Sequence, residues 1–115
     1  MVHKLERKSF ETARLYHKTE QYKSASLALR QAMKDYPDSP FREEMLWLIL
    51  DSHYQYAEQS TERRKLERYN EAIEAFLSFV ARYPESRFMP RAQRIYDACV
   101  AEVARLTETT PAESL

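Results

Sequence analysis

Two hexapeptides, YPDSPF at 36–41 and YPESRF at 83–88, indicate how this chain of 115 residues folds. In each hexapeptide the proline disfavours the α conformation in the tyrosine before it, so a helix is expected to end at that tyrosine. The serine can cap the following helix through its hydroxyl group. The phenylalanine can pack into the corner between the two helices. Each hexapeptide therefore predicts a hinge between two antiparallel helices.

Apolar side chains recur every three or four residues on both sides of the hinges, which is the pattern of amphipathic helices. No useful length of the chain alternates with the period of a strand. We therefore predict an all-α fold with five helices, over about residues 4–18, 21–36, 40–59, 65–83 and 87–106. Residues 1–106 would form one domain, whereas residues 107–115 lack this periodicity and are expected to be disordered.

The predicted helix at 40–59 differs from its neighbours because it is apolar on more than one side. It contains MLWLIL at 45–50, the longest apolar run in the chain. A helix that is apolar all round is normally enclosed by other helices. We therefore expect the 40–59 helix to lie between the others.

The two hexapeptides begin 47 residues apart, at 36 and 83, and the same offset relates Tyr22 to Tyr69. A sustained offset of this kind indicates a helical repeat. The spacing of small, bulky and proline residues resembles the tetratricopeptide repeat, whose period is about 34 residues. In the first copy the matching residues are Ala13, Tyr16, Ala25, Leu29, Ala32 and Pro37. We predict a right-handed solenoid of two repeats and a capping helix. The extra residues would lie mostly in AEQSTERRKLERY at 57–69, as longer helices or a longer loop.

The composition argues against several classes of function. The chain has 18 basic and 18 acidic residues, whereas nucleic-acid-binding proteins normally carry a basic excess. It has no glycine, which excludes glycine-rich nucleotide-binding motifs and removes the residue that forms left-handed helix caps most easily. No stretch approaches the length of a membrane-spanning helix. The N-terminal residues also lack the apolar core of a signal peptide.

Histidine and cysteine offer little for catalysis or metal binding. The three histidines lie far apart in the sequence, without the i, i+4 spacing of helical metal ligands; they are His3, His17 and His53. Cys99 is the only cysteine, and its place on an apolar stripe predicts a buried structural residue. We therefore expect no catalytic residue, no metal and no cofactor. An enzyme would need His17, His53 and a carboxylate to converge.

Cationic side chains supply the candidates for a partner-binding site. Four of them cluster in the 57–69 connector: Arg63, Arg64, Lys65 and Arg68. Arginine suits bidentate contacts to carboxylates and is enriched at interfaces, so this cluster is a candidate site for an acidic partner. Glu62 and Glu67 interrupt it, and a solvated helix start is the alternative interpretation. Stacked helix pairs also form a concave surface, which we expect to be lined by Arg14, His17, Lys18, His53 and Tyr56.

Four stretches of the chain resemble one known family. They are FETARLYHKTEQYKSA (10–25), YPDSPFREEMLWLILDSHYQYAEQS (36–60), ERRKLERYNEAIEAFLSFVARYPESRF (62–88) and RAQRIY (91–96). They are similar to the C-terminal half of the BamD (YfiO) family, the outer-membrane assembly lipoproteins of the BAM complex, particularly the form found in Bacteroidetes. Generic repeats lack the long connection that joins AEQS to ERYNEAI, which makes this tract the most specific. The resemblance covers about residues 5–106.

The resemblance implies a non-catalytic protein–protein interaction scaffold at the periplasmic face of the outer membrane. Its implied partners are the POTRA domains of the BamA barrel and the accessory lipoproteins of the complex, with no nucleic acid. Family members begin with a signal peptide and a lipid-bearing cysteine, followed by further repeats. Membrane attachment is therefore expected only through an N-terminal lipid anchor that this chain does not contain, as in the C-terminal part of a longer protein. Another tetratricopeptide adaptor of the cell envelope or the cytoplasm is the alternative function.

Overall fold

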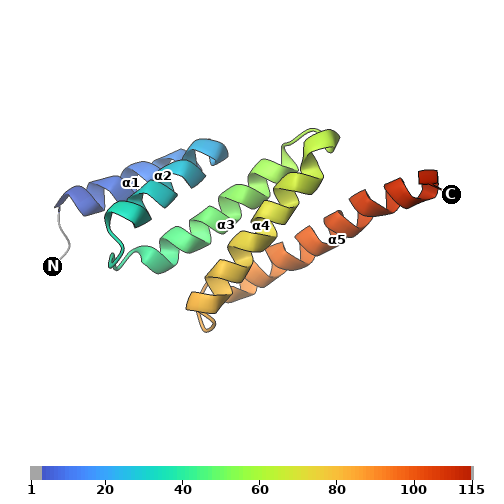
Figure 1. Ribbon diagram of the computed structural model, residues 1–115. Coiled ribbons are helices and arrows are strands. Elements are labelled where there is room, and N and C mark those ends of the chain that lie inside the picture. Colours follow the sequence, from blue (N-terminus) through green and yellow to red (C-terminus); the bar gives the residue numbers. More distant parts are fainter. Residues whose placement is uncertain (1–3, 115) are drawn as a thin grey trace.

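The computed structural model describes the backbone of residues 4–114 and the side chains of residues 4–108. This part of the chain contains five helices and no strand, which confirms the predicted all-α fold. Neighbouring helices lie side by side and antiparallel (Figure 1), as in a tetratricopeptide-like solenoid. Their bounds are α1 Lys4–Lys18, α2 Tyr22–Asp35, α3 Arg42–Glu58, α4 Glu62–Arg82 and α5 Met89–Ser114.

The α3 helix lies at the centre of the stack. Each helix packs against the next one along the chain, and α3 also contacts α1 and α5. All six side chains of the run at 45–50 are buried, with at most 9% of their surface exposed. The enclosed position that this apolar run predicts is therefore confirmed.

The α4 helix begins earlier than predicted. It starts at Glu62 instead of residue 65, and only residues 59–61 connect it to α3. The stretch ERRKLER consists of residues with high helix propensity, which explains the early start. The extra residues of the repeat therefore lengthen the helices and not the loop.

The α5 helix ends later than predicted. It continues to Ser114, so residues 107–114 are helical where the sequence predicts a disordered tail beyond 106. No glycine interrupts this stretch, and its one proline comes near the end. The Thr107 hydroxyl also donates to the carbonyls of Val103 and Ala104, at 2.9 and 3.1 Å. Losing the apolar periodicity therefore does not by itself end the helix.

The two hinges have the same backbone geometry. In the first, the Ser39 N–H donates to the Tyr36 carbonyl at 3.0 Å, and the Arg42 N–H donates to the Ser39 carbonyl at 3.1 Å. The Ser39 Oγ atom accepts the Phe41 N–H at 3.1 Å. The second hinge repeats these bonds 47 positions later, at 3.1, 3.0 and 3.1 Å. Each tyrosine ends its helix as predicted. The prediction that the serine caps the next helix is wrong, because Phe41 precedes α3 without a side-chain cap and each serine oxygen accepts an N–H within the turn before the helix.

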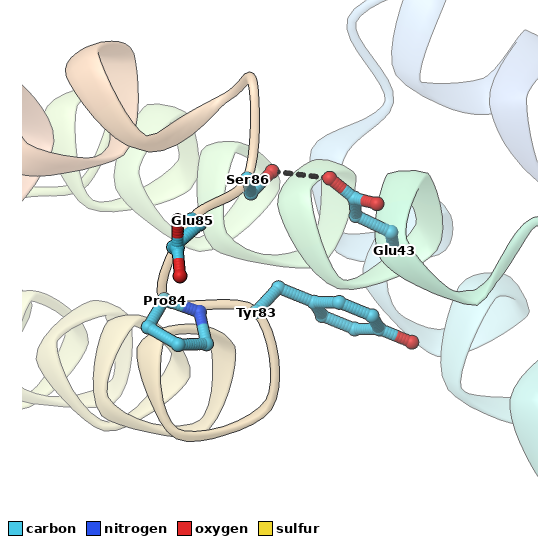
Figure 2. Close-up of a pocket in the computed structure, with 5 residues that line it drawn as sticks. All are labelled: Glu43, Tyr83, Pro84, Glu85 and Ser86. Atoms are coloured by element: carbon cyan, nitrogen blue, oxygen red, sulfur yellow. Dashed lines mark hydrogen bonds between the residues drawn. The ribbon is translucent and has the colours of Figure 1, made fainter.

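One contact distinguishes the second hinge from the first. The Ser86 hydroxyl donates to the Glu43 carboxylate of α3 (Figure 2), whereas no described carboxylate accepts from Ser39. The hollow at this point holds about 300 Å³ and is lined by Glu43, Tyr83, Pro84, Glu85 and Ser86. The second hinge is therefore tied to the first turn of α3 as well as to its own backbone.

Stacked aromatic rings with arginines over them close both hinges. The Phe10 and Phe41 rings stack with their centres 4.5 Å apart. The guanidinium of Arg14 lies over Phe10, and that of Arg7 lies over Phe41. In the second hinge the Trp47 and Phe88 rings stack in the same way. The guanidinium of Arg87 lies over Phe88, and that of Arg91 lies over Trp47. Cation–π contacts of this kind contribute about 0.5–2 kcal/mol each, depending on burial.

The corner between α1 and α2 places a left-handed residue in a chain without glycine. Glu20 has a φ of 62°. Its N–H donates to the His17 carbonyl at 3.0 Å, and the Gln21 N–H donates to the Tyr16 carbonyl at 2.9 Å. These bonds form a Schellman motif, in which glycine usually occupies the left-handed position. The Cβ of Glu20 therefore costs about 1 kcal/mol of backbone strain.

We expect Glu20→Gly to stabilise the protein by about 0.5–1 kcal/mol, because glycine adopts a positive φ without the steric cost of a Cβ. Glu20→Ala removes the charge but keeps the Cβ, and should leave the free energy of unfolding within about 0.5 kcal/mol of the parent value. Urea unfolding followed by circular dichroism measures both variants. Equal stabilisation by alanine and glycine would assign the effect to the charge and not to the backbone.

Ser86→Ala should destabilise the protein by about 2 kcal/mol and Ser39→Ala by about 1 kcal/mol. Each change removes the hydroxyl that accepts a backbone N–H, but only Ser86 also donates to a carboxylate. Parallel urea titrations of the two variants measure the difference. Equal losses of unfolding free energy would show that the contact with Glu43 contributes nothing.

Candidate partner-binding surface

Three of the predicted binding residues come together on one face of the solenoid. Arg14, His17 and Lys18 of α1 line a pocket of about 520 Å³. The rest of its lining comes from the α1–α2 corner, the start of α2 and α3, through Glu20, Tyr22 and Leu48 respectively. The spacing of three and four residues puts the α1 side chains on one side of that helix. These three residues therefore line one pocket, and their role in binding a partner stays a prediction.

Polar pairs join this side of α1 to α3. The His17 Nε2 and Asp51 Oδ2 atoms are 2.6 Å apart. The Gln55 amide donates to the other oxygen of Asp51 at 3.4 Å. One turn earlier, the Arg14 guanidinium lies 3.6 Å from the Glu44 carboxylate. Both carboxylates that α3 presents here are therefore already engaged by α1 side chains.

His53 and Tyr56 do not reach this pocket, although the sequence groups them with it. The His53 Nε2 atom lies 3.0 Å from a nitrogen of Arg30 in α2. Burial, and secondarily the charge of Arg30, lower the pKa of His53 to about 4. Tyr56 faces α4, where the Arg68 guanidinium lies 4.3 Å from its ring centre. Each residue turns a helix by about 100°, so positions 53 and 56 lie on other sides of α3 than Asp51.

The connector cations do not form one patch. Arg68 donates to the Ser60 Oγ atom at 2.8 Å and lies over the Tyr56 ring, so it holds the α3–α4 corner together. Arg63 and Arg64 are exposed. Of the four connector cations, these two are therefore the ones that are exposed and that make no contact at the α3–α4 corner.

Lys65, the fourth connector cation, belongs to a polar junction between α4 and α5. The Arg105 guanidinium lies 2.9 Å from Glu102 and 3.4 Å from Glu62 of α4. The hydrogen bond from Arg105, supported by the charge of Lys65, lowers the pKa of Glu102. Lys65 is half-buried near this junction, where its charge acts on Glu102 together with that of Arg105.

Cys99 is fully buried in α5, as predicted. Burial, with the nearby charges of Glu58 and Glu102, raises the pKa of its thiol to about 12. The thiol therefore stays protonated at neutral pH and packs as a small apolar side chain.

A second pocket, which the sequence does not predict, opens between α3 and α5. It holds about 240 Å³ and is lined by Trp47, Asp51, Tyr54, Gln55, Arg91, Arg94 and Ile95. The Arg91 guanidinium lies 5.0 Å from the Trp47 ring centre. The sequence signal for this site is RAQR at 91–94, where the i, i+3 spacing puts both arginines on one side of a helix.

Among the described residues, no three His, Cys, Asp or Glu side chains are grouped to hold a metal ion. His17 and His53 lie on opposite sides of α3 and do not converge, while His3 lies outside the described residues. No helix in the described part of the chain combines the length and the hydropathy that a membrane crossing requires.

Stability should fall as the pH is lowered from about 6.5 toward about 4, in part because of His53. Its pKa is lower in the folded protein, so the unfolded state binds the proton first in this range and is favoured. His53→Gln should therefore lose less stability than the parent between about pH 7 and pH 4.5. Urea unfolding at the two pH values measures the difference. An identical pH dependence would contradict this role of His53.

Comparison with known proteins identifies the family. Residues 3–107 match the family model YfiO, described as outer membrane lipoprotein. No curated protein sequence matches the chain. The matched residues include both hinges, helices α1 to α4 and most of α5, in agreement with the resemblance found in the sequence. The chain therefore belongs to the YfiO family of outer membrane lipoproteins.

Proposed function

We propose that this chain is a non-catalytic scaffold in the assembly of outer-membrane β-barrel proteins, at the periplasmic face of the outer membrane. Its proposed partners are the POTRA domains of BamA and the accessory lipoproteins of the same complex. The observation that carries the proposal is the family match over residues 3–107, which includes all five helices in whole or in part. Attachment to the membrane would come through an N-terminal lipid anchor.

The shape and surface of the solenoid support a role in protein binding. Stacked helices present a broad surface whose side chains are held by the packing beneath them. Around α3, arginines and aromatic rings lie together, and both residue types are enriched at protein interfaces. Pairs such as His17 with Asp51 hold this surface in one arrangement before a partner arrives. Preorganised side chains reduce the entropy that binding costs.

The exposed connector arginines are the proposed contact with an acidic partner. Arg63 has no ion-pair partner among the described residues, and Arg64 lies 3.6 Å from Glu67, with both side chains more than half exposed. An exposed pair of this kind stabilises a fold by little, so Arg64 can exchange Glu67 for a carboxylate of a partner. Charges at the rim of an interface mainly raise the association rate.

Arg63→Glu combined with Arg64→Glu should weaken binding to the purified periplasmic domains of the cognate BamA by about tenfold, mostly through slower association. Surface plasmon resonance at low and moderate salt measures the rates, and circular dichroism checks the fold. The matched control is Lys4→Glu combined with Lys8→Glu, an equal charge change at exposed positions of α1. Unchanged affinity in the arginine variant would remove the connector from the docking surface.

A further inference from the structure

Two pockets along α3 merge into one groove that is bounded by α2 and α4. They hold about 390 and 180 Å³, and both are lined by Arg30, Leu46 and Ile49. Lys34 of α2 also lines the larger pocket, and Glu74 of α4 also lines the smaller one. The shared residues make the groove continuous, with α2 as one rim and α4 as the other.

The α2 rim carries a row of basic residues. Its exposed positions 23, 27, 30 and 34 follow the spacing that keeps side chains on one side of a helix. This basic row consists of Lys23, Leu27, Arg30 and Lys34. Within the described residues, none of its three cations lies within ion-pair distance of a carboxylate. Asp35, the other charged residue of α2, lies off the row and accepts a hydrogen bond from Gln31.

The α4 rim carries an acidic row with the same spacing. This row consists of Glu67, Glu71, Glu74 and Ser78, which are all exposed. In the described part of the chain, Glu71 and Glu74 form no ion pair, and Glu67 pairs with Arg64 at 3.6 Å on the exposed surface. Arg30 and Glu74 line one pocket but form no ion pair with each other. The two rows therefore balance in charge but hold opposite signs on opposite rims.

This divided charge determines what kind of partner fits the groove. A uniformly acidic or basic partner would be attracted by one rim and repelled by the other. A second copy of this chain carries both rows, and a two-fold axis parallel to the helices would place the basic row of each copy over the acidic row of the other. An axis across the helices would bring like charges together. The charges therefore favour one partner and one direction of the axis.

We propose that two copies of this chain associate through their α2 and α4 rims, about a two-fold axis parallel to the helices. The α2 and α4 helices run in the same direction (Figure 1). Arg30 and Glu74 lie at the same level of the stack, because they line one pocket. Rotation about this axis keeps that level, so Arg30 of one copy meets Glu74 of the other. Seven residues earlier in each helix, Lys23 meets Glu67.

Apolar side chains on both rims add to this contact. Leu27 of α2 and Leu77 of α4 are 61% and 52% exposed, and a second copy would remove them from water. The 14 residues of α2 span about 21 Å. Because α2 and α4 lie within about 20 Å of each other across α3, each copy contributes on the order of 400 Å². A standard interface buries about 800 Å² per partner, so the dimer should be weak and reversible.

Sedimentation velocity of the chain alone tests the proposal, over about 20–500 μM protein. We expect a monomer–dimer equilibrium that weakens about tenfold between about 20 and 300 mM salt, because salt screens exposed charges. Lys23→Glu combined with Lys34→Glu should weaken the dimer at least about tenfold. Glu71→Lys combined with Glu74→Lys should do the same. Each variant brings like charges together on facing rows.

An equimolar mixture of the two variants should recover the dimer. The α2 rim of the first variant is acidic and faces the basic α4 rim of the second, while their two unchanged rims keep the parent contact. We therefore expect a heterodimer within about threefold of the parent affinity. None of the four substituted side chains forms an ion pair within the described residues, so each variant should keep the parent melting temperature.

The matched control is Lys4→Glu combined with Lys8→Glu, an equal charge change on α1, which should leave the equilibrium unchanged. A parent chain that stays monomeric at every concentration would overturn the proposal. Dimers that survive in both variants, or a mixture that stays monomeric, would also overturn it. The inference goes beyond the proposed function, and its test contains no BamA, so neither result decides whether the chain binds BamA.

Discussion

The burial of α3 is the constraint on which the other helices depend. Six consecutive residues, 45–50, are all buried, and burying one large apolar side chain contributes about 1.5–3 kcal/mol. No single neighbour can cover a helix on every side, so α1, α2, α4 and α5 all pack against it. This arrangement needs sharp reversals before and after the α3–α4 pair. The two hinges supply them with the same three hydrogen bonds.

The polar residues of α3 lie where its neighbours meet it. Asp51 and Glu44 face α1, and His53 faces α2, each next to a partner of suitable chemistry. A buried polar group without a partner is costly, so these pairs fix which side of each neighbour turns toward α3. The packing of the helices therefore decides where these polar side chains lie.

Arginines that look alike in the sequence have different roles in the fold. Arg14 and Arg91 lie over aromatic rings at the hinges, and Arg68 lies over Tyr56 at the α3–α4 corner. Arg63 and Arg64 stay exposed. Proximity in the sequence groups Arg68 with Arg64, but the turn of the helix directs them to different surroundings. A cluster of cations is therefore a weak guide to a binding surface until the neighbouring helices are known.

The sequence by itself determined the hinges, the helices and the enclosed central helix, because proline geometry and apolar period act over a few residues. It also brought Arg14, His17 and Lys18 together, since they share one side of one helix. Only the tertiary structure separated His53 from them and added Arg94. Which side of α3 meets α1, and which meets α5, depends on packing between segments far apart in the chain. Local spacing carries no information about that choice, so the pockets beside α3 form only in the folded stack.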